Sequence, residues 1–357
     1  MSDPQIGKFL NKDEEVPTSE ADKELIGYIV SHTDQWRNHR DVNYLIYWNE
    51  YERMFRGIWD PSDKERQSER SRLVTPAMQQ AIESKQAEIS EAVFGRGEFF
   101  DIEDDINDQD KGDIELVRRQ MHEDFKRSKI KKAIDDVILL AELYGTGIGE
   151  IVVKEETVLA PATQPIPGAN MAAIGVKESK QFMVGLNPIS PKNFLVDPNA
   201  NSVEDSLGVA IEEYMSYYTI IEGIEKGIYR KINVVPSYRS TKLEEIQEQV
   251  PSRVDKLPVI RWYGLVPRSM LEGLEEKESE AEELFPEDSP ADQYSDMVEA
   301  VVVIADGQYL LKAEESPYMM KDRPVVAYQA DSLPGRFWGR GTAEKGYNMQ
   351  KALDAQM

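Results

Sequence analysis

A glycine-rich run, YGTGIG at residues 144–149, contains the residue types that bind nucleotide phosphates. A dinucleotide-binding fingerprint follows a strand, opens a helix and has GxGxxG spacing, so that the phosphates meet the helix N-terminus. Here the order is reversed, because a helical pattern precedes the run and a strand pattern follows it. We therefore expect Gly145 to end the helix and Gly147 to ease the turn into the strand, with no cofactor-binding site here.

Gly335, Gly339 and Gly341 lie near two arginines and suggest a second phosphate loop. A P-loop requires Gly-Lys-Ser/Thr at a fixed distance from its first glycine. The fifth position after Gly335 is Arg340, and no Gly-Lys-Ser/Thr occurs in the chain. The chain is therefore not expected to be a P-loop ATPase, and these glycines are expected to let the backbone kink before a terminal helix.

An acidic cluster at 101–110 and two histidines seven residues apart are the candidates for metal binding. An EF-hand loop needs Gly at position six and Glu at position twelve. Counted from Asp108, the glycine falls at position five and Arg119 at position twelve, so we interpret the cluster as a solvated acidic turn, with weak ion binding of another kind left open. His32 and His39 have no third ligand in view, and we assign no metal site.

Nucleophilic catalysis also lacks candidates. The chain has no cysteine and three histidines, which excludes disulfides, cysteine-type zinc clusters and a thiol nucleophile. Neither GxSxG nor HExxH is present. We predict no catalytic residue and no cofactor, and therefore a protein that is not an enzyme.

Composition bounds the remaining classes. The 357 residues carry 42 Lys+Arg against 66 Asp+Glu, a formal net charge of -24. Such an excess repels phosphate backbones and anionic lipid, so binding to nucleic acid by general attraction is excluded. The longest apolar run, 300–305, is about a third of a membrane span, and the N-terminus lacks a signal-peptide pattern. We expect a soluble protein with two or more packed units and no membrane partner.

Helices are predicted for residues 21–145, after a flexible arm at 1–20. Aromatic residues recur at helical spacing from about Asp41 to Trp59, and Asp60-Pro61 is expected to stop that helix. We interpret this stripe as core or subunit packing, because a base-stacking platform needs neighbouring basic residues. Other helices are expected from Ala21, after Thr75-Pro76 with Thr75 as N-cap and Val93 facing the core, and over 114–125 and 130–144.

After Gly145 the period becomes that of strands. Two strands, 148–153 and 182–186, are expected to be joined by a Pro/Ala/Gly-rich excursion at 159–175. Residues 272–299 hold twelve acidic residues against one lysine, which indicates a solvated loop or helix. Further elements are expected as strands at 194–196, 209–214, 259–266, 298–304, 309–312 and 324–328, a turn at Asp306-Gly307, and a helix at 217–226.

A final helix is expected from Thr342 or Ala343 onward, and it has no C-cap signal. We therefore expect the chain to be cut from something longer. Helices and strands together predict an α+β fold.

Five segments, taken in order, resemble the portal (head-tail connector) proteins of tailed bacteriophages, particularly the podovirus type. Each motif is short, and their order from about residue 35 to the end carries the resemblance. The segments are ERSRLVTP at 69–76, YGTG at 144–147, NPISPKNFLVDP at 187–198, RPVVAY at 323–328 and SLPGRFWGRGTAE at 332–344.

The resemblance implies a ring of subunits, usually a dodecamer, at one capsid vertex, with a central channel for genome packaging and ejection. By that analogy, residues 21–145 are the helical part of the wing, and 146–335 are its α/β part with the acidic loop 272–299. Residues 336–357 then begin the stem helix, and the chain is truncated before clip and crown. The implied partners are further copies of the chain, the major capsid protein, a scaffold, the terminase ATPase, a tail adaptor and passing double-stranded DNA. The implied location is the virion, after assembly in the host bacterial cytoplasm.

Six basic residues are the candidates for contacts in such a ring. A head-to-tail ring interface needs two different complementary patches, and arginines opposite an acidic neighbour would supply one of them. Lysines on the terminal helix would meet phosphates transiently if it lines the channel, and a solvated or intersubunit position is the alternative. The candidates are Arg37, Arg40, Arg53 and Arg56 for the subunit interface, and Lys345 and Lys351 for the DNA channel.

A second interpretation belongs to a different class: an acidic α+β phage adaptor or scaffold protein that binds only proteins. A nucleotide-dependent enzyme is a third, and it depends on the Gly145 region alone.

Overall fold

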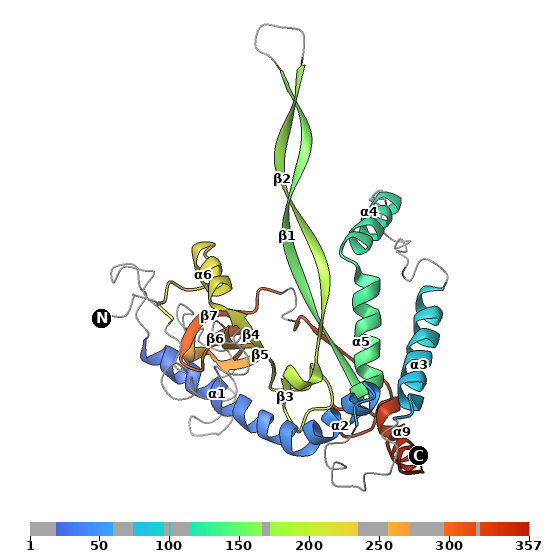
Figure 1. Ribbon diagram of the computed structural model, residues 1–357. Coiled ribbons are helices and arrows are strands. Elements are labelled where there is room, and N and C mark those ends of the chain that lie inside the picture. Colours follow the sequence, from blue (N-terminus) through green and yellow to red (C-terminus); the bar gives the residue numbers. More distant parts are fainter. Residues whose placement is uncertain are drawn as a thin grey trace, which may run out of the picture. The chain divides into compact units, whose positions relative to one another are not determined.

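The computed structural model describes residues 19–59, 74–95, 100, 114–165, 172–234, 256–271, 296–318 and 322–356. Helices and antiparallel sheets together form an α+β fold, which confirms the predicted class (Figure 1). The chain divides into two compact units that interleave along the sequence. Unit 1 comprises Met1–Glu50, Ser190–Arg323 and Leu333–Trp338, and unit 2 comprises Tyr51–Ile189, Pro324–Ser332 and Gly339–Met357.

Several predicted features lie outside the described residues. They are the arm up to residue 18, the acidic turn at 101–110, and the acidic block up to residue 295. In the described ranges, no helix has the length and apolarity needed to cross a membrane.

Helix α1, Glu20–Arg40, begins at a capping box. The Ser19 hydroxyl oxygen accepts a hydrogen bond from the Asp22 amide at 3.0 Å, and the Asp22 carboxylate accepts one from the Ser19 amide at 3.1 Å. Two backbone N–H groups that a helix start leaves unsatisfied are thereby paired.

The first two predicted helices, which meet near Asp41, are joined without a loop. A π-helical segment, Asp41–Leu45, joins α1 directly to α2, Ile46–Phe55. The backbone keeps helical dihedrals on both sides of the segment, because no Pro or Gly interrupts it. Helix α2 also ends earlier than predicted, with Gly57 at a φ of 65°, so Trp59 lies outside it.

Unit 1 contains a five-stranded antiparallel sheet in the order β3-β4-β5-β6-β7. Asp306 and Gly307, with φ values of 53° and 64°, form the tight turn between the last two strands, which confirms the predicted hairpin. The strands are β3 Phe194–Val196, β4 Gly208–Ser216, β5 Lys256–Pro267, β6 Met297–Ala305 and β7 Tyr309–Glu315.

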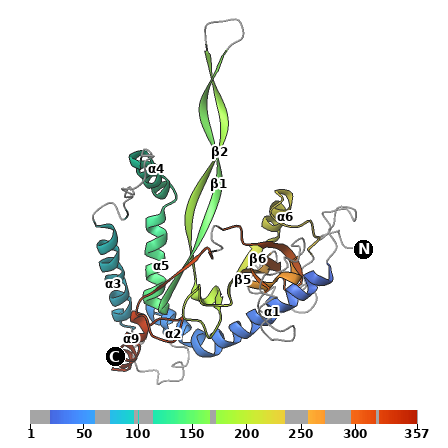
Figure 2. The same ribbon diagram turned by 180° about the vertical axis from the view of Figure 1, so that it is seen from behind.

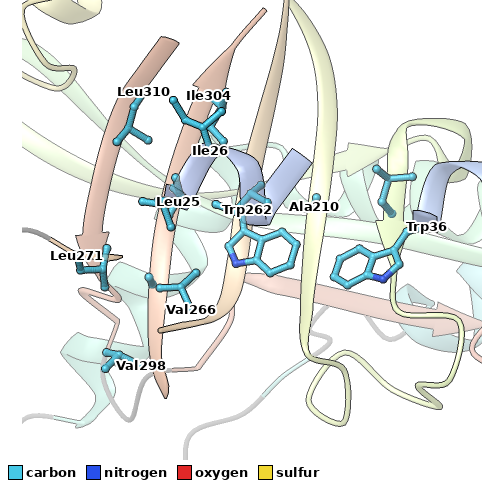
Figure 3. Close-up of a cluster of buried hydrophobic side chains, with 14 residues drawn as sticks. Leu25, Ile26, Trp36, Ala210, Trp262, Val266, Leu271, Val298, Ile304 and Leu310 are labelled. Atoms are coloured by element: carbon cyan, nitrogen blue, oxygen red, sulfur yellow. The ribbon is translucent and has the colours of Figure 1, made fainter. Parts of the chain in front are cut away.

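Two apolar clusters cover opposite faces of this sheet. Helix α1 covers one face, where Leu25 and Ile29 are fully buried and the ring of Trp36 stacks on Trp262 at a centroid distance of 5.0 Å (Figure 3). Helix α6, Tyr217–Glu225, covers the other face through Ile220. Each such side chain contributes about 1.5–3 kcal/mol by leaving water, so the sheet is held from both sides.

The helices of unit 2 are α3 Ala77–Phe94, α4 Ile114–Arg127, α5 Ile130–Tyr144 and α9 Thr342–Gln356. The predicted bounds of α5 are confirmed, and those of α4 are confirmed to within two residues. Two details of α3 are wrong: its N-cap is Pro76, without a side-chain hydrogen bond, and Val93 is exposed while the adjacent Phe94 is buried.

Unit 2 also contains a three-stranded antiparallel sheet in the order β2-β1-β8. Strands β1, Thr146–Pro165, and β2, Ala172–Ile189, form a long hairpin, and β8, Val325–Gln329, pairs with the start of β1. Within the predicted excursion at 159–175, the described residues, 159–165 and 172–175, belong to these two strands. Pro161 is tolerated because β8 pairs with β1 no further than Glu150, so a missing N–H there breaks no second ladder.

Candidate functional site

The start of α9 is built against the end of α5, through glycines that leave no room for a side chain. Gly145 ends α5 with a φ of 100°, as predicted, and a Cβ there would lie 2.2 Å from the Gly339 carbonyl oxygen. The Gly339 amide donates a hydrogen bond to the Thr146 hydroxyl at 2.8 Å. The two segments, almost 200 residues apart in the chain, are therefore locked backbone against backbone.

A buried carboxylate fastens the first turn of α9. The Thr342 hydroxyl donates to Glu142 Oε2 at 2.5 Å, and Glu142 is 3% exposed. A Cβ on Gly341 would lie 2.5 Å from the Glu142 carbonyl oxygen, so this glycine also permits a close approach. Gly339 and Gly341 were expected only to let the backbone kink. They also allow the backbone before α9 to lie in direct contact with the end of α5.

Helix α9 also caps helix α3. The Gln350 side chain, 2% exposed, accepts a hydrogen bond from the Met78 amide at 3.1 Å and donates one to the Thr75 carbonyl at 2.7 Å. The Asp354 carboxylate accepts from the Thr75 amide at 3.3 Å and from the Gln350 side chain at 2.8 Å. Gln350 thus pairs with the Met78 amide, the donor that the Thr75 hydroxyl would accept from if Thr75 were the N-cap, as predicted. We call this assembly the α9 root. It consists of Gly145, Gly339, the hydrogen-bonded pair of Glu142 and Thr342, and Gln350, with their partners.

The two predicted channel lysines lie on the exposed side of α9. Lys345 forms an ion pair with Asp331, and its hydrogen bond holds the pKa of the Asp331 carboxyl below its usual range. The Lys351 ammonium lies 4.5 Å from the ring centroid of Tyr347. Both cations thus have partners in their own unit, and their contact with DNA stays a prediction.

Two of the four predicted interface arginines share a carboxylate in unit 1. Arg37 Nε lies 2.7 Å from Glu212 Oε1, and Arg40 Nη1 lies 3.1 Å from Glu212 Oε2. The Arg40 side chain is 8% exposed and also pairs with Asp41, while Arg37 also pairs with Asp34. These charges bind α1 to β4 within one chain.

Arg53 and Arg56 belong to unit 2, at the end of α2. Arg53 donates to the Ile58 carbonyl at 2.8 Å, and Arg56 pairs with Glu52 at 3.2 Å with 62% of its side chain exposed. The structure therefore does not gather the four arginines into one cluster within either unit. Their role in a subunit interface stays a prediction.

Sequence reasoning missed Arg323, whose guanidinium holds together several carbonyls of unit 1. It pairs with Glu299 Oε1 at 2.7 Å and donates to the Ser206 carbonyl at 2.8 Å and the Ser206 hydroxyl at 2.7 Å. It also donates to the carbonyls of Val203 and Leu207. Arg323 is the first residue of the segment RPVVAY, which was a signal in the sequence. Its partners could not be identified from the sequence because they lie up to 120 residues away.

The histidines are engaged in aromatic packing. His32 Nδ1 lies 2.8 Å from the Tyr28 carbonyl oxygen, with its ring 6.3 Å from that of Trp262, and His39 lies 5.9 Å from the Tyr44 ring. Among the described residues, no group of three or more His, Cys, Asp or Glu could hold a metal ion.

No family model matches this chain. No curated protein matches it either. Buried polar groups hold α9 against α3 and α5 at the α9 root, and Arg323 holds the loop before β4 to β6.

Proposed function

We propose that this chain is a portal-type subunit, which forms a ring at one capsid vertex and provides the channel for genome packaging and ejection. The observation that carries the proposal is the α9 root. All five segments that resemble portal proteins contribute residues to this root or to the sheet beside it. These residues are Thr75, Gly145 and Thr146, the pairing partners 187–189 and 325–328, and Gly339 to Thr342.

This convergence supports the proposal because segments that resemble one family and lie far apart in the sequence meet within unit 2. They lie up to 275 residues apart, and their shared neighbourhood is the base of the terminal helix. In a portal, that helix begins the stem. In a ring lined by twelve such helices, the base of each helix must be rigid. The Gln350 side chain on α9, which caps α3, and the hydrogen bond between Thr342 and Glu142 provide this rigidity.

The charge of the chain fits a conduit. A channel must let a polyanion slide, so strong phosphate contacts would act as a brake, whereas an acidic wall imposes no register. The net charge of -24 and the pairing of Lys345 with Asp331 both weaken attraction to phosphate. We propose a structural role, with translocation energy supplied by a terminase ATPase and with capsid protein, scaffold and tail adaptor as further partners in the virion.

The mass of the protein in solution tests the proposal. The protein, expressed to the stop codon of its reading frame, is analysed by light scattering and electron microscopy, alone and with scaffold added. A closed species of about a dozen protomers with a central hole is expected. A monomer or dimer under both conditions would refute the portal and favour the acidic adaptor that binds only proteins.

A matched pair of glycine variants tests whether ring formation depends on the α9 root. Gly339→Ala places a Cβ 2.6 Å from the Gly145 carbonyl oxygen, whereas Gly27→Ala in α1 has nothing within 4 Å. We expect Gly339→Ala to lower the yield of rings and Gly27→Ala to leave it unchanged, at equal protein concentration and with folding of both checked by circular dichroism.

A further inference from the structure

One face of the three-stranded sheet in unit 2 carries a row of exposed apolar side chains. Residues directly opposite in antiparallel strands point to the same side of the sheet, and so do alternate residues along each strand. The register places Val153 opposite Val184, and Gly149 opposite Val326. The exposed members of this row, here called the ribbon face, are Ile151, Val153, Phe182, Val184, Val326 and Tyr328.

The same face is covered at its base and open farther out. Gly147 belongs to this face, and a Cβ there would lie 2.0 Å from the Val137 carbonyl oxygen, so α5 packs directly on it. Beyond that contact, the hairpin of β1 and β2 extends past α5 as a two-stranded ribbon (Figures 1 and 2). Along the hairpin from Gly147, the exposed fraction is 63% at Val153 and 69% at Phe182.

A two-stranded ribbon with exposed apolar side chains is unusual in water. A two-stranded hairpin alone is marginally stable, and long edge strands are normally protected by bulges or covered by another element. The register of β1 and β2 runs without a shift, unlike that of β6 and β7. Among the described residues, β2 pairs with β1 on one side and has no strand on its other side. The apolar row therefore requires a cover.

Charge selects the occupant. Residues 146–189 hold three lysines and four glutamates, a net charge of -1, whereas the whole chain carries -24. Two copies of this protein repel each other over most of their surface, and the ribbon is a place where they can meet without that cost. Interfaces between copies of one chain are also the most apolar class, whereas nucleic acid requires basic residues.

We propose that the ribbon face is a contact surface between copies of this chain. The inference rests on the self-association that the proposed function requires, and it names the surface responsible. It holds equally for a smaller homo-oligomer, so the two proposals have separate outcomes.

The test is the double variant Phe182→Ser/Val184→Ser in the full-length protein, analysed by sedimentation over a range of concentrations. Both side chains are largely exposed, so folding is expected to persist and is checked by circular dichroism. Self-association should weaken by about tenfold or more, because truncated apolar anchors of an interface carry most of its binding energy. The matched control is Tyr218→Ser, another exposed aromatic, 73% exposed on α6 in unit 1, which should leave association unchanged.

A second measurement locates the contact. Residues 1–357 contain no cysteine, so Val153→Cys introduces the single thiol of this part of the protein. A spin label there should lose mobility on association. Rings that form with wild-type strength in the double variant would overturn this inference and leave the portal proposal standing. If the wild-type protein forms open dimers and the double variant is monomeric, the inference is supported and the ring is refuted. If the wild-type protein stays monomeric at every concentration, the inference itself is overturned.

Discussion

Replacement of Arg323 by alanine should be among the most damaging single changes in unit 1. The guanidinium is 7% exposed, and its charge is balanced by Glu299, which is itself 20% exposed. Its remaining donors satisfy Ser206 and the carbonyl of Leu207. The variant removes one member of a buried ion pair and leaves the others in place.

The magnitude follows from what remains behind. Breaking a buried ion pair by removing one partner costs about 3–5 kcal/mol, because the other charge stays desolvated. Each orphaned buried carbonyl adds about 1–3 kcal/mol, which water entering the vacated space partly offsets. We expect Arg323→Ala to lower the free energy of unfolding of unit 1 by about 3–5 kcal/mol, a large part of the 5–15 kcal/mol typical of a domain.

Urea unfolding followed by tryptophan fluorescence measures this loss. Four of the five tryptophans, including the stacked Trp36 and Trp262, belong to unit 1 and so report on it. Arg323→Lys keeps the charge but not the fork of donors, and should lose an intermediate amount. The control Lys226→Ala removes an exposed pair of i,i+4 type with Glu222 in unit 1 and should cost about 0.3–0.5 kcal/mol. The reasoning is refuted if Arg323→Ala unfolds within about 1 kcal/mol of wild type.

Two further predictions concern the α9 root and its exposed side. Gln350→Leu orphans the Met78 amide, so hydrogen exchange at the start of α3 should accelerate, whereas Asn348→Ala on the exposed side of α9 should leave it unchanged. The hydrogen bond from Lys345 depresses the pKa of Asp331, so their ion pair is complete above the ordinary carboxyl value of 3.8 and is lost as pH falls through the depressed value. NMR titration of the Asp331 carboxyl should show this low value, and Lys345→Met should return it to normal; equal titration curves would contradict the assignment.

Local signals in the sequence were sufficient for several elements. The apolar spacing of α5 and the glycine after Tyr144 predicted both of its ends. The Asp306-Gly307 pair predicted the β6–β7 turn, because those residues accept positive φ values. In each case the determinant lies within a few residues of the feature.

Features with distant determinants were not predictable. Thr75 resembled an N-cap, yet the group that serves α3 is Gln350, 275 residues away. The contacts of the basic residues with a neighbouring subunit or with DNA stay a prediction, and their partners within the chain, Glu212 and Asp331, follow from tertiary packing. The Pro- and Gly-rich stretch at 159–175 resembled a loop because strand propensity is weak there, whereas the long register with β2 overrides it.

The packing of α1 against the sheet of unit 1 has a consequence for synthesis on the ribosome. Trp36 emerges early, and its stacking partner Trp262 is added 226 residues later. At about 5–20 residues per second, the apolar side of α1 waits roughly 10 to 45 s before its cover exists. Unit 1 cannot close until strands β5 to β7, residues 256–315, have left the exit tunnel, so it closes long after its first helix, which is among the earliest parts made.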